Sequence, residues 1–178
     1  MGQPRKPNLN TEELWTYSLR LLSGRSLSSG EVREKLRRRA EEGADLEEVI
    51  SRLKESGYLN DARFAEGFAT ARRDFEGFGQ FRVMQDLRKR RVAPAVAEKA
   101  ASEAFSEVDE TVQAESYLVR KYRGKDLPVF LAEEKNMASA YRRLRTAGFG
   151  SGTAIRVLKR FSKRAEELED APEEPGEG

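Results

Sequence analysis

The chain has 178 residues, with 33 Lys and Arg against 31 Asp and Glu, and it contains no Cys and no His. These counts exclude a disulfide framework, a thiolate zinc site, a cysteine nucleophile and general-base catalysis by histidine. The charge is unevenly spread: residues 165–178 carry seven acids and no base, so the other 24 acids leave residues 1–164 with a net charge of +9.

Apolar residues recur with the 3.6-residue period of an α-helix, and alternating strand-like runs are almost absent. Start signals support this pattern, because Ser28 and Glu31 have the spacing of a capping box and Pro94 suits a first helical position. We therefore predict an all-α fold with nine helices, over residues 11–24, 29–42, 46–56, 61–75, 80–91, 94–105, 108–122, 133–147 and 151–162.

The nine helices fall into three sets of three with related middle helices. The pattern Val32-x-x-x-Leu36-Arg37 has a similar counterpart at 83–88, which begins 51 residues later. A third counterpart, at 140–145, begins 57 residues after the second. Such a period indicates stacked supersecondary units. We predict three tandem three-helix modules in an elongated, curved array, with a single helical bundle as the alternative. The predicted parts are a flexible N-terminus (1–10), modules over 11–59, 60–106 and 107–164, and a disordered acidic tail (165–178).

Catalysis finds no support in the residues. Nearly all carboxylates occupy helix caps or lie four residues from a base, where they support helix surfaces. The segment 148–153 (GFGSGT) resembles a phosphate loop, but it lacks the P-loop lysine and follows a helix instead of a strand. We interpret Gly148 as a helix C-cap and Ser151 as the next N-cap. The prediction is a protein that is not an enzyme and binds no metal or cofactor.

Binding through bases is the better interpretation. Basic clusters stand at 37–39, 88–91, 142–145 and 159–164, the first three in the C-terminal half of each middle helix. Cations there oppose the helix dipole, yet one or two per helix suffice for that, so the surplus could contact phosphates or acidic side chains. Solvated helix faces and codon bias are the alternatives. Phe75, Phe78 and Phe81 could stack on nucleic-acid bases, but we expect them to close the core between short helices.

No apolar run approaches the roughly 18 residues of a membrane span, and the N-terminus is not a signal peptide. We therefore expect a soluble cytoplasmic protein. The tail at 165–178 is predicted to fold back weakly on the basic face, or to act only as a solubilising terminus.

Several motifs together resemble the RecX family of regulators of the RecA recombinase. The resemblance is specific over residues 14–92 and looser over 108–162. It lies in Glu34-Lys35-Leu36, then Tyr58-Leu59-Asn60-Asp61-x-Arg63-Phe64-Ala65, then Gly77-x-Gly79-x-x-Arg82 and Leu87-Arg88. One departure is Arg91, which stands where the family usually has a glycine after the second middle helix.

The resemblance implies three tandem three-helix repeats and a monomer that lies in the groove of the RecA–DNA filament. It also implies inhibition of filament growth, ATPase and strand exchange, in DNA repair, recombination and the SOS response. Direct binding to single- or double-stranded DNA is the alternative. Asp61 and Arg63 are expected to fix the junction between modules. The expected partner-binding residues are Arg25, Arg37, Arg38, Arg72, Arg82, Arg88, Lys89, Arg90, Arg142 and Arg145.

Overall fold

The computed structural model describes residues 8–161, which contain ten α-helices and one π-helical turn. Within this range the only strand-like pairing is an isolated bridge between Leu9 and Ala40. The predicted all-α fold is therefore confirmed. The chain divides into two compact parts, unit 1 (Met1–Ala69 with Gln85–Ala101) and unit 2 (Thr70–Met84 with Ser102–Gly178), which are described separately.

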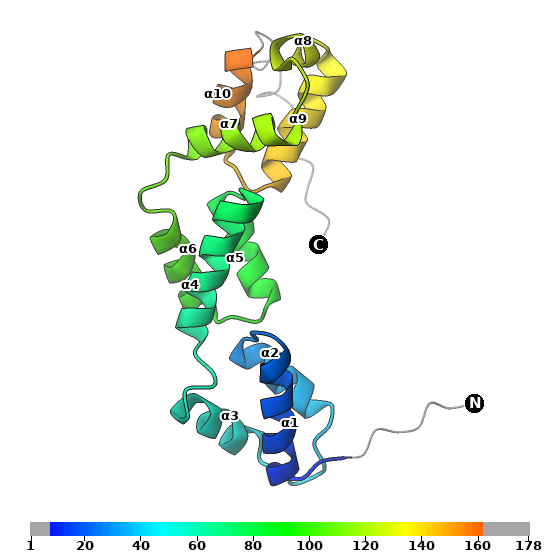
Figure 1. The fold of residues 1–178 in the computed structure, drawn as a ribbon, viewed down its shortest axis with the longest axis vertical. Coiled ribbons are helices and arrows are strands. Elements are labelled where there is room, and N and C mark those ends of the chain that lie inside the picture. Colours follow the sequence, from blue (N-terminus) through cyan, green and yellow to red (C-terminus); the bar gives the residue numbers. More distant parts are fainter. Residues whose placement is uncertain (1–7, 162–178) are drawn as a thin grey trace, which may run out of the picture. The chain divides into compact units, whose positions relative to one another are not determined.

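Three helices, α1 (Thr11–Gly24), α2 (Ser29–Arg37) and α3 (Leu46–Glu55), pack against one another in unit 1, blue to cyan in Figure 1. Each begins at a polar cap that accepts a backbone N–H three residues on, which satisfies one of the free donors of the first turn. Their apolar faces meet in one core, formed by Leu14, Leu27, Val32, Leu36, Val49, Ile50, Leu53 and Leu59.

Helix α4 (Asp61–Ala71) continues into η1 (Arg72–Glu76), a π-helical turn that ends at Gly77. The sequence predicted one regular helix over 61–75. The wider last turn leaves carbonyl groups that need donors, and the Arg120 guanidinium donates to two of them, those of Phe75 and Glu76. Helices α5 (Gln80–Lys89) and α6 (Pro94–Ala104) follow.

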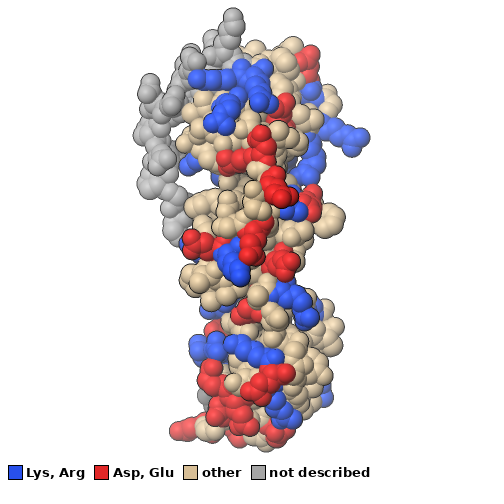
Figure 2. Space-filling model, turned by 90° about the vertical axis from the view of Figure 1, so that its left-hand side faces the viewer, with Lys and Arg blue, Asp and Glu red and all other residues tan. Residues whose placement is uncertain are grey.

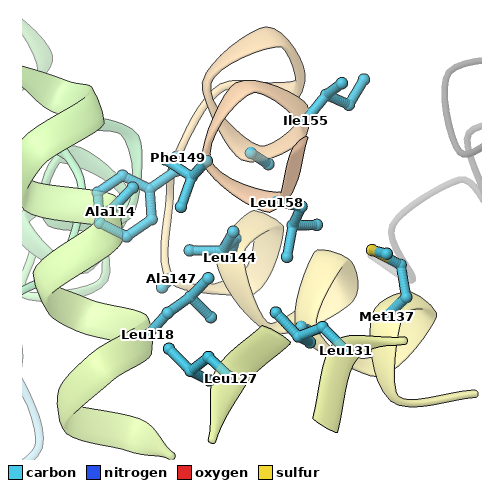
Figure 3. Packing of buried hydrophobic residues seen from close by; sticks show 13 residues of the cluster. Ala114, Leu118, Leu127, Leu131, Met137, Leu144, Ala147, Phe149, Ile155 and Leu158 are labelled. Atoms are coloured by element: carbon cyan, nitrogen blue, oxygen red, sulfur yellow. The ribbon is translucent and has the colours of Figure 1, made fainter. Parts of the chain in front are cut away.

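Unit 2 holds a second core between α7 (Glu110–Lys121), α8 (Leu127–Leu131), α9 (Glu134–Thr146) and α10 (Ser151–Phe161). Helix α10 packs against the other three. In Figure 3, Leu118 of α7 and Leu144 of α9 point toward each other, with Phe149 and Leu158 beside them.

Two further features of the fold differ from the sequence prediction. Helix α8 was missed, because five residues are too few to show a helical period. Helix α2 ends at Arg37 instead of residue 42, because the chain beyond it pairs with Leu9, whose N–H lies 2.6 Å from the Arg39 carbonyl oxygen. The same pairing holds Leu9, which was predicted to lie in a flexible N-terminus.

No helix among residues 8–161 is long and apolar enough to span a membrane. Residues 1–7 and the acidic tail (165–178) lie outside the described range.

Candidate partner-binding surface

The N-terminus of α2 meets the C-terminus of α5 in unit 1, a contact that we call junction 1. The Ser28 hydroxyl, which caps α2, also donates a hydrogen bond to the carbonyl oxygen of Arg90. A Cβ atom on Gly30 would lie 2.3 Å from the carbonyl oxygen of Arg91, so glycine is needed for this close backbone approach. The positive end of one helix dipole thus faces the negative end of another, which is favourable.

An arginine clamp closes junction 1. The Arg90 guanidinium donates to both carboxylate oxygens of Glu31, at 2.7 and 3.0 Å, and to the carbonyl oxygen of Ser26 at 3.1 Å. Its Cζ atom also lies 5.1 and 5.5 Å from the ring centroids of Phe64 and Phe68, within cation–π range. Arg90 was predicted to contact a partner, but its guanidinium is engaged inside the chain.

Helix α4 contributes a further contact to junction 1. Asp61 accepts a hydrogen bond of 2.7 Å from the backbone N–H of Ser29, in the first turn of α2. This agrees with the junction role expected for Asp61. The side chain of Arg63 is exposed, and no such contact of its guanidinium is found in the described part of the chain.

Arg91 keeps the turn that a glycine was expected to make. Its φ of 57° is the only positive value among the non-glycine residues of the described range. The Arg91 N–H donates to the Arg88 carbonyl and the Val92 N–H donates to the Leu87 carbonyl, which is the hydrogen-bond pattern of a Schellman motif. Arg91 therefore replaces the expected glycine, and the left-handed turn is still present.

A second helix-end contact, junction 2, lies in unit 2, where the N-terminus of α5 meets the C-terminus of α9. The Gly79 N–H donates to the Ala147 carbonyl oxygen over 2.8 Å. A Cβ atom on Gly79 would lie 2.4 Å from the Gly148 carbonyl oxygen, and one on Gly148 would lie 2.4 Å from the Arg82 nitrogen. The C-cap of α9 is Ala147, so Gly148 lies one residue beyond the C-cap position predicted for it. Its φ of +92° is the left-handed conformation that glycine favours just after a helix.

Side chains around Phe78 complete junction 2. The Gln113 amide donates to the Phe78 carbonyl oxygen over 2.9 Å. The guanidinium carbons of Arg72 and Arg82 lie 5.8 and 5.4 Å from the Phe78 ring centroid. Arg82 also reaches the Thr146 carbonyl oxygen at 3.4 Å.

The basic clusters end the middle helices, as the sequence predicted, with bases in the last turns of α2, α5 and α9. The ten candidate residues divide by exposure, and their role as contact residues stays a prediction. Three are partly buried, namely Arg72, Arg82 and Arg90, and seven are exposed, namely Arg25, Arg37, Arg38, Arg88, Lys89, Arg142 and Arg145.

Glu34 gathers part of the first basic cluster. Its carboxylate lies 2.9 Å from Arg38, 3.6 Å from Arg37 and 3.9 Å from Arg91. The hydrogen bond from Arg38 and then the charge of Arg91 lower the pKa of Glu34 below its usual value of 4.5. Arg37 and Arg38 are exposed, but they already share Glu34 as one counter-ion.

Two aromatic residues lie where the sequence did not place them. Phe75 is 81% exposed and Phe81 is 57% exposed, so the expectation that they close the core was wrong. The expectation holds for Phe78, which packs against the core of unit 2. The π-helical turn and junction 2 determine which of these three rings are exposed. Neither feature can be recognised from the local sequence pattern.

The loop at 148–153 binds a carboxylate from its own chain. Glu110 accepts the Gly150 N–H at 2.9 Å and the Thr153 hydroxyl, at the N-terminus of α10. The helix begins at Ser151, so Gly150 takes the N-cap position that was assigned to Ser151. A carboxylate from α7 therefore occupies the anion-favouring end where a phosphate would bind.

The face shown in Figure 2 carries basic and acidic side chains next to one another, so it offers both signs of charge to a partner. In residues 8–161, no group of three or more His, Cys, Asp or Glu side chains could hold a metal ion. These features define a class: an all-α protein of small helical modules, joined through helix ends and carrying basic clusters at those ends.

Comparisons with known proteins specify the family. Residues 15–53 match the model of the RecX first three-helix domain, and residues 60–100 match the model of its second three-helix domain. A "Regulatory protein RecX" of Deinococcus radiodurans is 34% identical over 164 residues, which cover 90% of this chain and 76% of that protein. The relative of the same name from Streptomyces coelicolor is 30% identical over 175 residues, covering 98% and 88%. The chain belongs to the RecX family of regulatory proteins.

Solved structures agree in fold. The crystal structure of RecX from Lactobacillus salivarius has a TM-score of 0.62 at 18% identity, covering 85% of this chain and 96% of that one. A second crystal structure of a regulatory protein RecX has a TM-score of 0.63, also at 18% identity, covering 84% and 73%.

Proposed function

We propose that this chain inhibits a RecA recombinase by binding in the groove of the RecA–DNA filament, which limits filament growth, ATPase activity and strand exchange. In this proposal it is a cytoplasmic, non-enzymatic monomer that acts in DNA repair and recombination. Membership of a family of regulatory proteins is the observation that carries the proposal.

The basic clusters supply a physical means of binding. Bases recur in the last turns of α2, α5 and α9, and several of them are exposed, so they add positive charge to the surface that a filament with carboxylates or phosphates would meet. Weak contacts spread over several modules of one chain strengthen one another through effective concentration. Arg37 and Arg142 are used in the test, because both are exposed and they belong to two different basic clusters.

The test is titration of the protein into recombinase filaments on single-stranded DNA, following ATP hydrolysis and filament length. We expect both to fall, and we expect Arg37→Glu with Arg142→Glu to weaken the effect by about tenfold, the equivalent of about 1.4 kcal/mol. Lys54→Glu with Lys135→Glu is the matched control, since it changes the net charge by the same amount and both lysines are exposed and lie outside the predicted set. Unchanged ATPase and filament length at saturating protein would refute the proposal.

Direct DNA binding is a second candidate, and the exposed rings of Phe75 and Phe81 favour it. Exposed aromatic rings near bases can stack on single-stranded nucleic acid. Affinity for bare single-stranded DNA should be compared with affinity for recombinase-coated DNA at the same salt concentration. Equal or tighter binding to bare DNA, lost in Phe75→Ala with Phe81→Ala, would support the second candidate over the first.

A further inference from the structure

Exposed apolar side chains gather on one face of α7. Val112 is 57% exposed and Val119 is 52% exposed, and their spacing of seven residues places them on the same side of the helix. They border a shallow hollow of about 620 Å³ that is lined by Val112, Glu115, Ser116, Val119, Arg120 and Arg123. This set is the α7 surface.

The α7 surface continues to η1. The Arg120 guanidinium donates to the Phe75 carbonyl oxygen at 3.2 Å, which holds this base beside a residue whose ring is 81% exposed. Two of the six exposed large hydrophobic residues of the described range, Val112 and Val119, therefore lie on the α7 surface, and a third, Phe75, is joined to it through Arg120. Clusters of exposed apolar side chains of this kind commonly mark binding sites.

The charge of the α7 surface is positive. Arg120 and the exposed Arg123 supply two bases. The one acid of the surface, Glu115, is paired with Arg160 of α10. An apolar surface with two bases and a neutralised acid fits a segment that is acidic and carries an apolar residue.

The chain itself contains such a segment close by. Residues 165–178 hold seven acids, no base and one leucine, Leu168. They follow Phe161, the last residue of α10, and its neighbour Arg160 pairs with Glu115 of the α7 surface. Lys121, the last residue of α7, is six residues beyond Glu115, about 9 Å along the helix, and Arg123 follows two residues later. The five residues from Phe161 to 166 span up to about 17 Å.

We propose that residues 165–178 dock in cis on the α7 surface, with their carboxylates facing Arg120 and Arg123 and with Leu168 against Val119. On charge alone, the acidic segment could equally dock at Arg142 on α9. The exposed valines and the pairing of Arg160 with Glu115 favour α7. In the docked state the acidic segment covers these two bases and the exposed valines beside them.

Because the chain has no cysteine, Ala171→Cys allows one spin label to be attached to the full-length protein without changing an acid or Leu168. The readout is the loss of methyl signal at each valine in NMR spectra. We expect strong loss at Val112 and Val119 and little at Val129, which is more exposed than either and lies on α8. The loss should disappear at about 1 M salt, where the screening length is about 3 Å.

Two matched substitutions in the labelled protein decide the site. Arg123→Glu should remove the signal loss at Val119, and Arg142→Glu should leave it unchanged. The proposal would be overturned by equal signal loss at Val129, or by a signal loss at Val119 that only Arg142→Glu removes. No signal loss at any valine would also overturn it, and the α7 surface would then be open to a separate partner. No recombinase is present in the experiment, so its result is independent of the proposed function.

Discussion

Junction 1 and junction 2 share one backbone arrangement and differ in the side chains that secure it. In both, the N-terminus of one middle helix meets the C-terminus of the next, and the acceptors are the Arg90 and Ala147 carbonyl oxygens. In junction 1 the donor is the Ser28 hydroxyl, whereas in junction 2 it is the backbone N–H of Gly79. One repeated contact is therefore made by two different chemistries.

The residue in the left-handed turn accounts for the difference. Gly148 makes this turn in junction 2 without a side chain, so the helix ends approach closely enough for a direct backbone hydrogen bond. Arg91 makes it in junction 1, where a hydroxyl bridges to the next helix and the pair of Glu31 and Arg90 secures the contact. Both junctions contain a glycine that an added Cβ atom would crowd. Junction 1 depends in addition on an ion pair, so it should also be sensitive to removed charges.

The largest effect is expected from Gly148→Ala in junction 2. The new Cβ would meet the Arg82 backbone at 2.4 Å in a left-handed conformation, so we expect a loss of about 3 kcal/mol in the free energy of unfolding. Urea denaturation followed by circular dichroism measures this. Gly124→Ala is the control, since Gly124 has a φ of +82° in open space and should cost only about 1 kcal/mol. Equal costs would show that crowding in junction 2 is unimportant.

The next effect is expected from Arg90→Met in junction 1. The substitution leaves the Glu31 carboxylate without its bidentate partner, and we expect a loss of about 2 kcal/mol. The single tryptophan, Trp15, lies in unit 1 and reports its urea unfolding by fluorescence. Lys89→Met, at an exposed neighbour, should change stability by less than about 0.5 kcal/mol. If the two variants are equally stable, the clamp does not secure the junction.

A smaller effect of opposite sign is expected from Arg91→Gly. Glycine adopts a positive φ without strain, so the variant should gain about 0.5 kcal/mol after its larger backbone entropy in the unfolded chain is deducted. The same fluorescence measurement applies. A destabilised variant would mean that the ion pair of Arg91 with Glu34, at 3.9 Å, outweighs the strain of the turn.

The smallest effect on stability is expected when the pH is lowered and Glu34 becomes protonated. The lowered pKa of Glu34 means that its ion pairs stabilise the folded state above pH 4.5, and that this contribution is lost as the pH falls through the folded-state value. Hydrogen exchange of the Arg91 and Val92 amides should therefore become less protected relative to global unfolding as the pH is lowered toward 4. Glu34→Gln should remove this pH dependence, and a dependence that persists would assign it to another carboxylate.

Helix positions were largely predictable because their signals are local. The capping box of Ser28 and Glu31 and the cap at Asp45 are present as expected. Apart from α8, which is too short to show a helical period, the errors occur where a segment distant in the sequence contacts the helix. Leu9 pairs with the chain just after α2, which ends earlier than predicted. Arg120 donates a hydrogen bond to the carbonyl oxygen of Phe75 in the π-helical turn, and the Phe75 ring is exposed.

The candidate site was predictable only as a set of exposed bases at helix ends. Arg90 is adjacent to Lys89 in a run of four bases, and nothing in that run distinguishes the residue that clamps junction 1 from its exposed neighbour. The α7 surface was also missed, because Val112 and Val119 fit an ordinary apolar stripe.

The sequence by itself determined the all-α class, most helix boundaries, the placement of basic clusters in the last turns of middle helices, and the resemblance to the RecX family. These depend on periodicity, capping and motifs, which act within a few residues. Only the tertiary structure decided that Arg90 pairs with Glu31, which is 59 residues away. It also decided that Arg91 makes a left-handed turn and that Phe75 is exposed. Those outcomes depend on which helix ends meet, and that is set by packing between segments far apart in the chain.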